Sequence, residues 1–345
     1  MKTTIKMESS RAFKVGLLTI VVVLFFFLSI GMLQAAGNSK VEMTVATFHP
    51  RTGSADVEGL YHFKELVEER SKGEIKVNVF YGGTLGGERE LVEQLKLETV
   101  DLCWSGWATR GAYVNNVIPW GVPYLFSSKE QIKATIDGRI GEEVKKAYLK
   151  QGIVWVGLYF RGNRQLTTNR YVRTPDDLKG MKIRLPETPE WLVVWKAFGC
   201  LPVPIPSPEV FSSLQTGVVE AQENPISSNY SKRLWEVQRY TVMTNHIVDM
   251  QGLLLSKMFL DGLDEEKRQI ILSASRDTLE WCNKLAADQE NTFKTEMEEK
   301  GMEFIQIDDI KPFEEIALST MDYFKKIWEP WVYEETIKAL AKVSK

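Results

Sequence analysis

Arg184 is the residue of this 345-residue chain whose type and setting most clearly suggest chemistry. It belongs to residues 182–185, which are predicted to form a short strand because Gly180 precedes them and Pro186 prevents further pairing. Side chains at a strand end of an open α/β sheet face a crevice. Arginine is always charged, and its planar guanidinium matches a carboxylate. Arg184 is therefore suited to bind an acid group, with a solvated surface arginine as the alternative.

Two more polar residues accompany Arg184 in the second half of the chain. Arg164 and Asn224 are both expected near strand ends, and the stiff turn at Pro225 positions the Asn224 side chain. Binding is the function that these residues indicate, because no catalytic pattern accompanies them. For Arg164 the alternative is a structural ion pair.

Signatures of catalysis and of metal binding do not occur in the sequence. The three histidines form no HExxH motif, there is no GxSxG motif, and the three cysteines are far apart and predicted to be buried free thiols. A glycine-rich stretch, residues 81–88, is followed by Arg89 and lacks the Lys and Ser/Thr of a phosphate loop. We therefore expect no catalytic residue, no metal and no cofactor.

The first 36 residues are predicted to be an export signal. Four basic residues and one acid lead into an apolar run, residues 15–33, and small residues follow at 35–37. We expect cleavage near Ala36 or Gly37 and a periplasmic mature protein; an uncleaved membrane anchor is the alternative, since ~20 apolar residues span a bilayer. The whole chain carries −3, which leaves about −6 without the leader. This mildly acidic remainder argues against a nucleic-acid partner.

The rest of the chain shows the pattern of an α/β protein. Strands are expected at residues 41–47, 75–81, 100–104, 153–159, 182–185, 218–222 and 302–307, and helices at 57–71, 89–97, 138–150, 190–198, 209–215, 312–328 and 332–343. Strands that alternate with helices predict βαβ units and a mostly parallel sheet.

Residues 264–300 constrain the architecture further. They contain neither Pro nor Gly, their apolar residues recur at helical intervals, and Gly301 ends the run. One helix of ~37 residues would be about 55 Å long, more than the width of a small domain. We favour a single helix that crosses two domains, with a kinked pair of helices as the alternative.

Three motifs together resemble the substrate-binding subunits of TRAP (tripartite ATP-independent periplasmic) transporters, the DctP-like family. They are Gly162-Asn-Arg164-Gln-Leu-Thr-Thr-Asn, Asp177-Leu-Lys-Gly-Met-Lys-Ile-Arg184-Leu-Pro and Gln215-Thr-Gly-Val-Val-Glu-Ala-Gln-Glu-Asn224-Pro. Their order and spacing agree with the family, and the resemblance extends from about Met43 to the C-terminal helix. Ala221 is a small departure, since the family usually has Gly there.

The resemblance implies a two-domain fold like that of periplasmic binding proteins, with a hinge and a long domain-spanning helix. We expect one domain at residues 40–162 plus about 250–285 and the other at 163–249 plus about 286–345, with the ligand cleft between them. The resemblance also implies a bidentate pair between Arg184 and a ligand carboxylate, supported by Arg164 and Asn224.

The opposite wall of the cleft is also assigned by resemblance. It would consist of the loop around Phe48 and His49, of Glu88, and of residues 104–107, with Trp104 and Ser105 among the ligand contacts. Trp104 and Trp107 could provide an aromatic slot or could pack in the core. Gly106 stands where sialic-acid-binding members carry an acid, which makes that ligand doubtful. Glu187 could accept a bond from a ligand hydroxyl or ammonium, with a solvated glutamate as the alternative.

The sequence thus predicts a solute-binding protein that captures a small organic acid, such as a hydroxy, keto, amino or aromatic acid. The resemblance implies delivery to separate TRAP permease subunits in the membrane. One alternative is a ligand-sensing subunit of a signalling system. The other is a hydrolase of similar fold that uses Glu88 or Glu223 as its base.

Overall fold

The computed structural model describes residues 40–343, and the predicted signal peptide lies outside these residues. Within the described part, the chain from Glu42 onward belongs to one structural unit. None of its helices combines the length and the apolar character that crossing a membrane requires.

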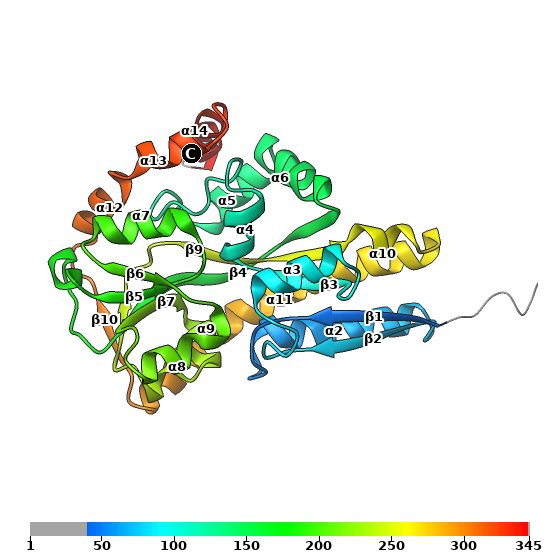
Figure 1. Ribbon diagram of the computed structural model, residues 1–345, viewed down its shortest axis with the longest axis horizontal. Helices are drawn as coiled ribbons and strands as arrows, with labels where there is room; N and C mark the ends of the chain where they lie inside the picture. The colour runs from blue at the N-terminus through cyan, green and yellow to red at the C-terminus, as the bar shows by residue number, and fades with distance from the viewer. Residues whose placement is uncertain (1–39, 344–345) are drawn as a thin grey trace, which may run out of the picture. The chain divides into compact units, whose positions relative to one another are not determined.

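A mixed sheet of ten strands forms the centre of this unit (Figure 1). The strands are β1 (Val41–Ala46), β2 (Ile75–Phe80), β3 (Leu102–Ser105), β4 (Ile153–Thr168), β5 (Lys182–Leu185), β6 (Leu201–Pro204), β7 (Ala221–Pro225), β8 (Tyr240–Met243), β9 (Val248–Ser256) and β10 (Glu303–Gln306). Their order is β2-β1-β3-β9-β4-β7-β5-β6, and β8 pairs with both β4 and β10.

Helices cover the sheet and connect its strands. They are α2 (Ala55–Arg70), α3 (Glu88–Lys96), α4 (Trp107–Tyr113), α5 (Lys129–Ile136), α6 (Arg139–Lys150), α7 (Pro189–Ala197), α8 (Val210–Gln215), α9 (Ile226–Ser231), α10 (Lys257–Asp261), α11 (Glu265–Glu299), α12 (Lys311–Leu318), α13 (Met321–Ile327) and α14 (Val332–Val343). The last helix returns to pack against α5 and α6 (Figure 1).

The long strand β4 belongs to both parts of the sheet. One part contains β2, β1, β3 and β9, and the other contains β7, β5 and β6. Its first part pairs with β9, and its last five residues, from Arg164, pair with β7. The register shifts between Phe160 and Asn163, where Gly162 adopts a φ of +80°. A side chain there would be strained in conformation and would meet the Glu290 carboxylate at about 2.7 Å, so this irregularity in the pairing of β4 with β9 favours glycine.

A single helix, α11, spans 35 residues, which confirms the predicted long helix. Asp264 caps its first turn by accepting a bond from the Lys267 N–H. The helix packs against α2, β4 and α9, so it contacts elements from both parts of the sheet (Figure 1). The α/β architecture with a domain-spanning helix is as predicted.

The prediction of a mostly parallel sheet was wrong for the central strands. β1 with β3, and β5 with β6 and β7, are parallel, but β9 runs antiparallel to both β3 and β4, and β4 runs antiparallel to β7. The strand β9 was not predicted. It is buried throughout, so it shows no alternation of apolar and polar residues.

Three predicted boundaries also need correction. The strand expected at 218–222 is β7, three residues later, so Asn224 lies inside it rather than after it. β4 runs beyond residue 159 to Thr168, so Arg164 is inside a strand rather than near a strand end. The helix expected at 312–328 divides at Ser319 and Thr320, whose hydroxyls donate to carbonyls of the preceding turn. The three cysteines are free and buried, as predicted.

Candidate functional site

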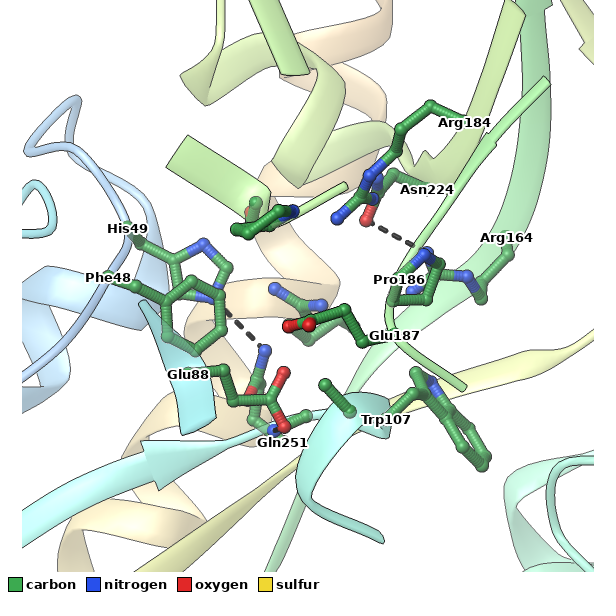
Figure 2. A pocket seen from close by; sticks show the side chains of 15 residues that line it. Phe48, His49, Glu88, Trp107, Arg164, Arg184, Pro186, Glu187, Asn224 and Gln251 are labelled. Carbon is green, nitrogen blue, oxygen red and sulfur yellow. Dashed lines mark hydrogen bonds between the residues drawn. The ribbon is translucent and has the colours of Figure 1, made fainter. Parts of the chain in front are cut away.

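A cavity lies where the loop after β1, the start of α4 and the ends of β5 and β7 meet. Its empty volume is about 480 Å³. It brings together seven of the nine predicted site residues, and Figure 2 shows these labelled side chains around one space: Phe48, His49, Glu88, Arg164, Arg184, Glu187 and Asn224. The parallel strands β5 and β7 deliver Arg184 and Asn224 to the same edge, since Arg184 is in register with Gln222.

Arg184 lies at the carboxyl end of β5 and is only 2% exposed. Its Nε donates to the Ile205 carbonyl at 2.8 Å, and no described carboxylate forms an ion pair with it. Figure 2 shows its guanidinium pointing into the cavity beside Asn224. Burial and nearby Arg164 lower the pKa of Arg184 to about 10, against the opposing influence of Glu223. Arg184 is thus a buried cation whose outer N–H groups face the cavity.

Arg164 also lines the cavity, but its guanidinium is already occupied. It donates to both Glu223 carboxylate oxygens, to Asp249 Oδ1 at 2.8 Å and to Asn224 Oδ1 at 3.0 Å. His246 Nε2 lies 3.0 Å from the same Glu223 carboxylate. Arg164 is therefore part of a structural ion-pair network as well as of the cavity wall.

The network extends through Arg161, which the sequence analysis did not single out. Arg161 Nη2 lies 2.6 Å from Asp249 Oδ2, and its Nη1 donates to Asp56 Oδ1 at 2.9 Å. Burial alone would raise the pKa of Asp249, but Arg161 and Arg164 outweigh burial and hold that pKa well below its usual range. The pKa of Glu223 is lowered in the same way, since Arg164 and His246 outweigh burial.

His49 and Gln251 form the neutral polar part of the wall (Figure 2). When the Gln251 amide is oriented so that Nε2 donates to the Ser105 carbonyl (2.8 Å), its Oε1 accepts from His49 Nε2 at 3.0 Å. Burial lowers the pKa of His49 to about 3 despite nearby Asp56, so the imidazole is uncharged. His49 Nδ1 has no described hydrogen-bond partner.

Glu88 lines the cavity and also holds the start of α4. One of its oxygens, Oε1, accepts from the N–H groups of Gly106 and Thr109, both at 2.7 Å. A carboxylate is favoured at a helix N-terminus, so Glu88 stabilises this turn. Gly106 permits the contact, because a Cβ there would lie 2.8 Å from Glu88 Oε2.

The two tryptophans around this turn have different positions. Trp104 lies in the core, with its ring 5.0 Å from that of Tyr159, and neither it nor Ser105 lines the cavity. Trp107 does line it, although Asp249 Oδ1 accepts from its indole N–H at 2.7 Å and Figure 2 shows its ring turned away. Trp104 and Ser105, which were predicted as ligand contacts, therefore lie outside the lining of this cavity. All four residues of β3 are buried, so the sequence could not show which side of the strand faces the cavity.

Glu187 reaches into the cavity from the turn after β5, and its backbone contacts α3. Arg89 Nη2 donates to the Glu187 carbonyl at 2.8 Å, while Arg89 Nε lies 3.9 Å from the Glu187 carboxylate. This contact joins the two walls of the cavity and leaves the carboxylate free to meet a ligand hydroxyl.

Several lining residues were missed by sequence reasoning. Arg161 and Gln251 line the cavity, and Asp249 supports it from behind. One signal was available for Asp249, since it is a single acid within the apolar run Ile247–Met250, and a buried charge requires a partner.

Comparisons with known proteins agree with this architecture. A profile of the family described as "Bacterial extracellular solute-binding protein, family 7" (DctP) matches residues 46–327. The 2,3-diketo-L-gulonate-binding periplasmic protein YiaO of Escherichia coli (strain K12) is 30% identical over 305 residues, 87% of this chain and 93% of the relative.

Solved structures of TRAP periplasmic solute-binding proteins superpose on most of the chain. One from Shewanella oneidensis with bound succinate is 26% identical, with a TM-score of 0.82 over 88% of this chain and 100% of that chain. One from Roseobacter denitrificans with bound L-galactonate is 27% identical, with a TM-score of 0.77 over 84% and 98%.

The match to the family extends over most of the chain, as the resemblance of the three motifs implied. The protein is an extracytoplasmic solute-binding protein that captures a small organic acid and delivers it to separate membrane permease subunits. The chain belongs to family 7 of the bacterial extracellular solute-binding proteins, the DctP family of TRAP transporters.

Proposed function

We propose that the ligand is a sugar acid or a related hydroxy or keto acid, and that Arg184 binds its carboxylate. The observation that carries this proposal is the guanidinium of Arg184, which is buried at the cavity without a described carboxylate partner. Burial of an unpaired charge is unfavourable, and a carboxylate that accepts two N–H bonds would compensate for it. Asn224 would support the same group, and Arg164 would contribute its charge from within the ion-pair network.

Sugar acids recur among the relatives. YiaO is named for 2,3-diketo-L-gulonate, and structures similar to this chain contain L-galactonate, β-D-galacturonate and D-glucuronate. The polar groups around the cavity suit such a ligand, since His49, Gln251 and Glu187 offer neutral and acidic partners for hydroxyl groups. A micromolar complex needs about −8 kcal/mol, which a few charge-assisted bonds of ~1.5–3 kcal/mol each can supply after ordering costs.

We also propose that the cavity closes by motion of two domains, residues 40–162 plus about 250–285 and residues 163–249 plus about 286–345. The pairing of β4 supports this boundary, because the strand pairs with β9 up to Asn163 and with β7 from Arg164 onward. A ligand that touches both walls would favour the closed state.

We propose further that the protein returns its ligand unchanged. The two candidate bases are engaged elsewhere, since Glu223 pairs with Arg164 and Glu88 holds the N-terminus of α4. Recovery of a bound sugar acid in chemically unchanged form after prolonged incubation is the expected result, and any stoichiometric conversion would contradict it.

A cleaved N-terminal signal is proposed from the sequence, and N-terminal sequencing of the exported protein would test it.

Replacement of Arg184 tests the main proposal. We expect Arg184→Ala to weaken sugar-acid binding at least a hundredfold by calorimetry, because the ligand carboxylate loses its counter-ion. Arg170→Ala is a matched control, since this arginine is exposed and only weakly paired with Glu220. Unchanged affinity in a folded Arg184 variant would reject the assignment.

A further inference from the structure

A second cavity adjoins the first. Phe48 and Ser207 line both, and the second holds an empty volume of about 780 Å³. It is bordered by the loops after β1 and β2 and by the residues that follow α9. The two cavities therefore meet at Phe48 and Ser207.

Lys232 gives the second cavity an amine that has no carboxylate partner among the described residues. Three charged residues line this cavity, and two of them, Arg233 and Glu236, form an ion pair with each other. Lys232 has no ion pair with a carboxylate in the described part of the chain; its Nζ donates to Ser228 Oγ at 2.8 Å. An ammonium has three donors, so this single bond leaves two of them unused.

The surroundings of Lys232 disfavour the charged form of its amine. The residue is half-buried at the C-cap of α9. Burial, with Arg184 and Arg161 nearby, lowers the pKa of Lys232 to about 7, although Asp56 opposes the shift. A carboxylate bound beside Lys232 would favour the protonated amine and so would raise this pKa again.

We propose that Lys232 forms a second anion subsite, which takes the distal carboxylate of a hydroxylated diacid whose first carboxylate binds Arg184. This inference rests on the sugar-acid function proposed above and narrows it to acids with a negative group at each end. Phe48 and Ser207, at the junction of the two cavities, would then contact the carbon chain and one of its hydroxyls. The exposed pair of Arg233 and Glu236 would remain outside the subsite.

A matched pair of six-carbon sugar acids tests the proposal. Galactonate carries one carboxylate and galactarate two, so calorimetry of both ligands with the full mature protein isolates the second charge. We expect wild type to bind the diacid about tenfold or more tightly than the monoacid. Lys232→Met should abolish this preference while it changes monoacid affinity less than about threefold.

Arg233→Met is the matched control, because it removes a neighbouring charge from the same cavity wall. We expect it to leave the ratio of the two affinities unchanged. Thermal unfolding of each variant without ligand shows whether it is folded, and a purely structural role of Lys232 would change stability but not the affinity ratio.

The outcomes separate the two proposals. Wild type that binds both acids equally or prefers the monoacid, or a Lys232 variant that keeps the diacid preference, overturns the subsite. Sugar-acid binding that is lost in Arg184→Ala would still support the proposed function in those cases. Wild type that binds neither acid overturns the subsite and counts against the sugar-acid function as well.

Discussion

Arg161 and Arg164 differ from Arg184 in what surrounds their guanidinium groups, although all three are buried and line the same cavity. The first two pair with Asp56, Asp249 and Glu223, whereas Arg184 has one backbone carbonyl. A paired buried cation holds the two parts of the sheet together. An unpaired buried cation can bind a ligand that supplies the missing negative charge. Burial alone therefore does not distinguish a structural arginine from a ligand-binding one.

The largest effect on stability is expected for the ion pairs of Arg161 and Arg164. Asp249→Asn should lower the free energy of unfolding by about 3–5 kcal/mol, because it leaves Arg161 and Arg164 without their shared counter-ion. Urea unfolding of the ligand-free protein measures this change. Asp277→Asn is the control: this half-exposed carboxylate pairs with Arg70 at the surface, and its loss should change stability by about 0.5 kcal/mol or less. Equal effects of the two substitutions would contradict the structural role of the network.

Acid should weaken the same network. The pKa values of Asp56, Glu223 and Asp249 are all lower in the folded protein than usual, since their cationic partners outweigh burial. Carboxylates of the unfolded chain titrate near pH 4. The unfolded state therefore binds protons first, and the stability that the network contributes above about pH 4 is lost as the pH falls towards the lower folded values.

The urea midpoint between pH 7 and pH 3 measures this loss. We expect a steeper decline for wild type than for Asp249→Asn, which has one fewer depressed carboxylate. Parallel declines would mean that the acid sensitivity originates elsewhere in the molecule.

The comparison also explains what could be read from the sequence. Arg184 was predictable because local signals, Gly180 and Pro186, define the strand that carries it. The long helix was predictable because residues 265–299 contain no Pro or Gly. The ion-pair network was not, since Arg161 and Asp249 are 88 residues apart and meet only through the antiparallel pairing of β4 with β9.

Strands that are buried on both faces were also difficult to interpret from the sequence. β3 and β9 contain only buried residues, so neither shows the alternation that would identify a face. The position of Trp104 in the core followed from packing against Tyr159, a partner 55 positions away in the sequence that local patterning does not reveal.

Replacement of Arg184, the cation without a carboxylate partner, should affect stability much less. Arg184→Met should change the free energy of unfolding of the ligand-free protein by no more than about 1 kcal/mol, because an apolar side chain replaces a buried charge that has no counter-ion. The lost bond to the Ile205 carbonyl acts in the opposite direction. Urea unfolding with and without ligand checks this. A loss as large as that of Asp249→Asn would mean that Arg184 is structural too.

The smallest effect is expected where the two walls of the cavity meet at the surface. Arg89 and Glu187 are each more than one third exposed, and their charged groups are 3.9 Å apart, so the ion pair should contribute about 1 kcal/mol or less. Arg89 also donates to the Glu187 carbonyl. Arg89→Gln should therefore raise the rate of ligand dissociation by about fivefold at most, with little change in association, because the contact exists only when the walls are together. Stopped-flow measurements of both rates check this, with exposed Arg173→Gln as the control. A hundredfold faster dissociation would mean that Arg89, like Arg184, contacts the ligand directly.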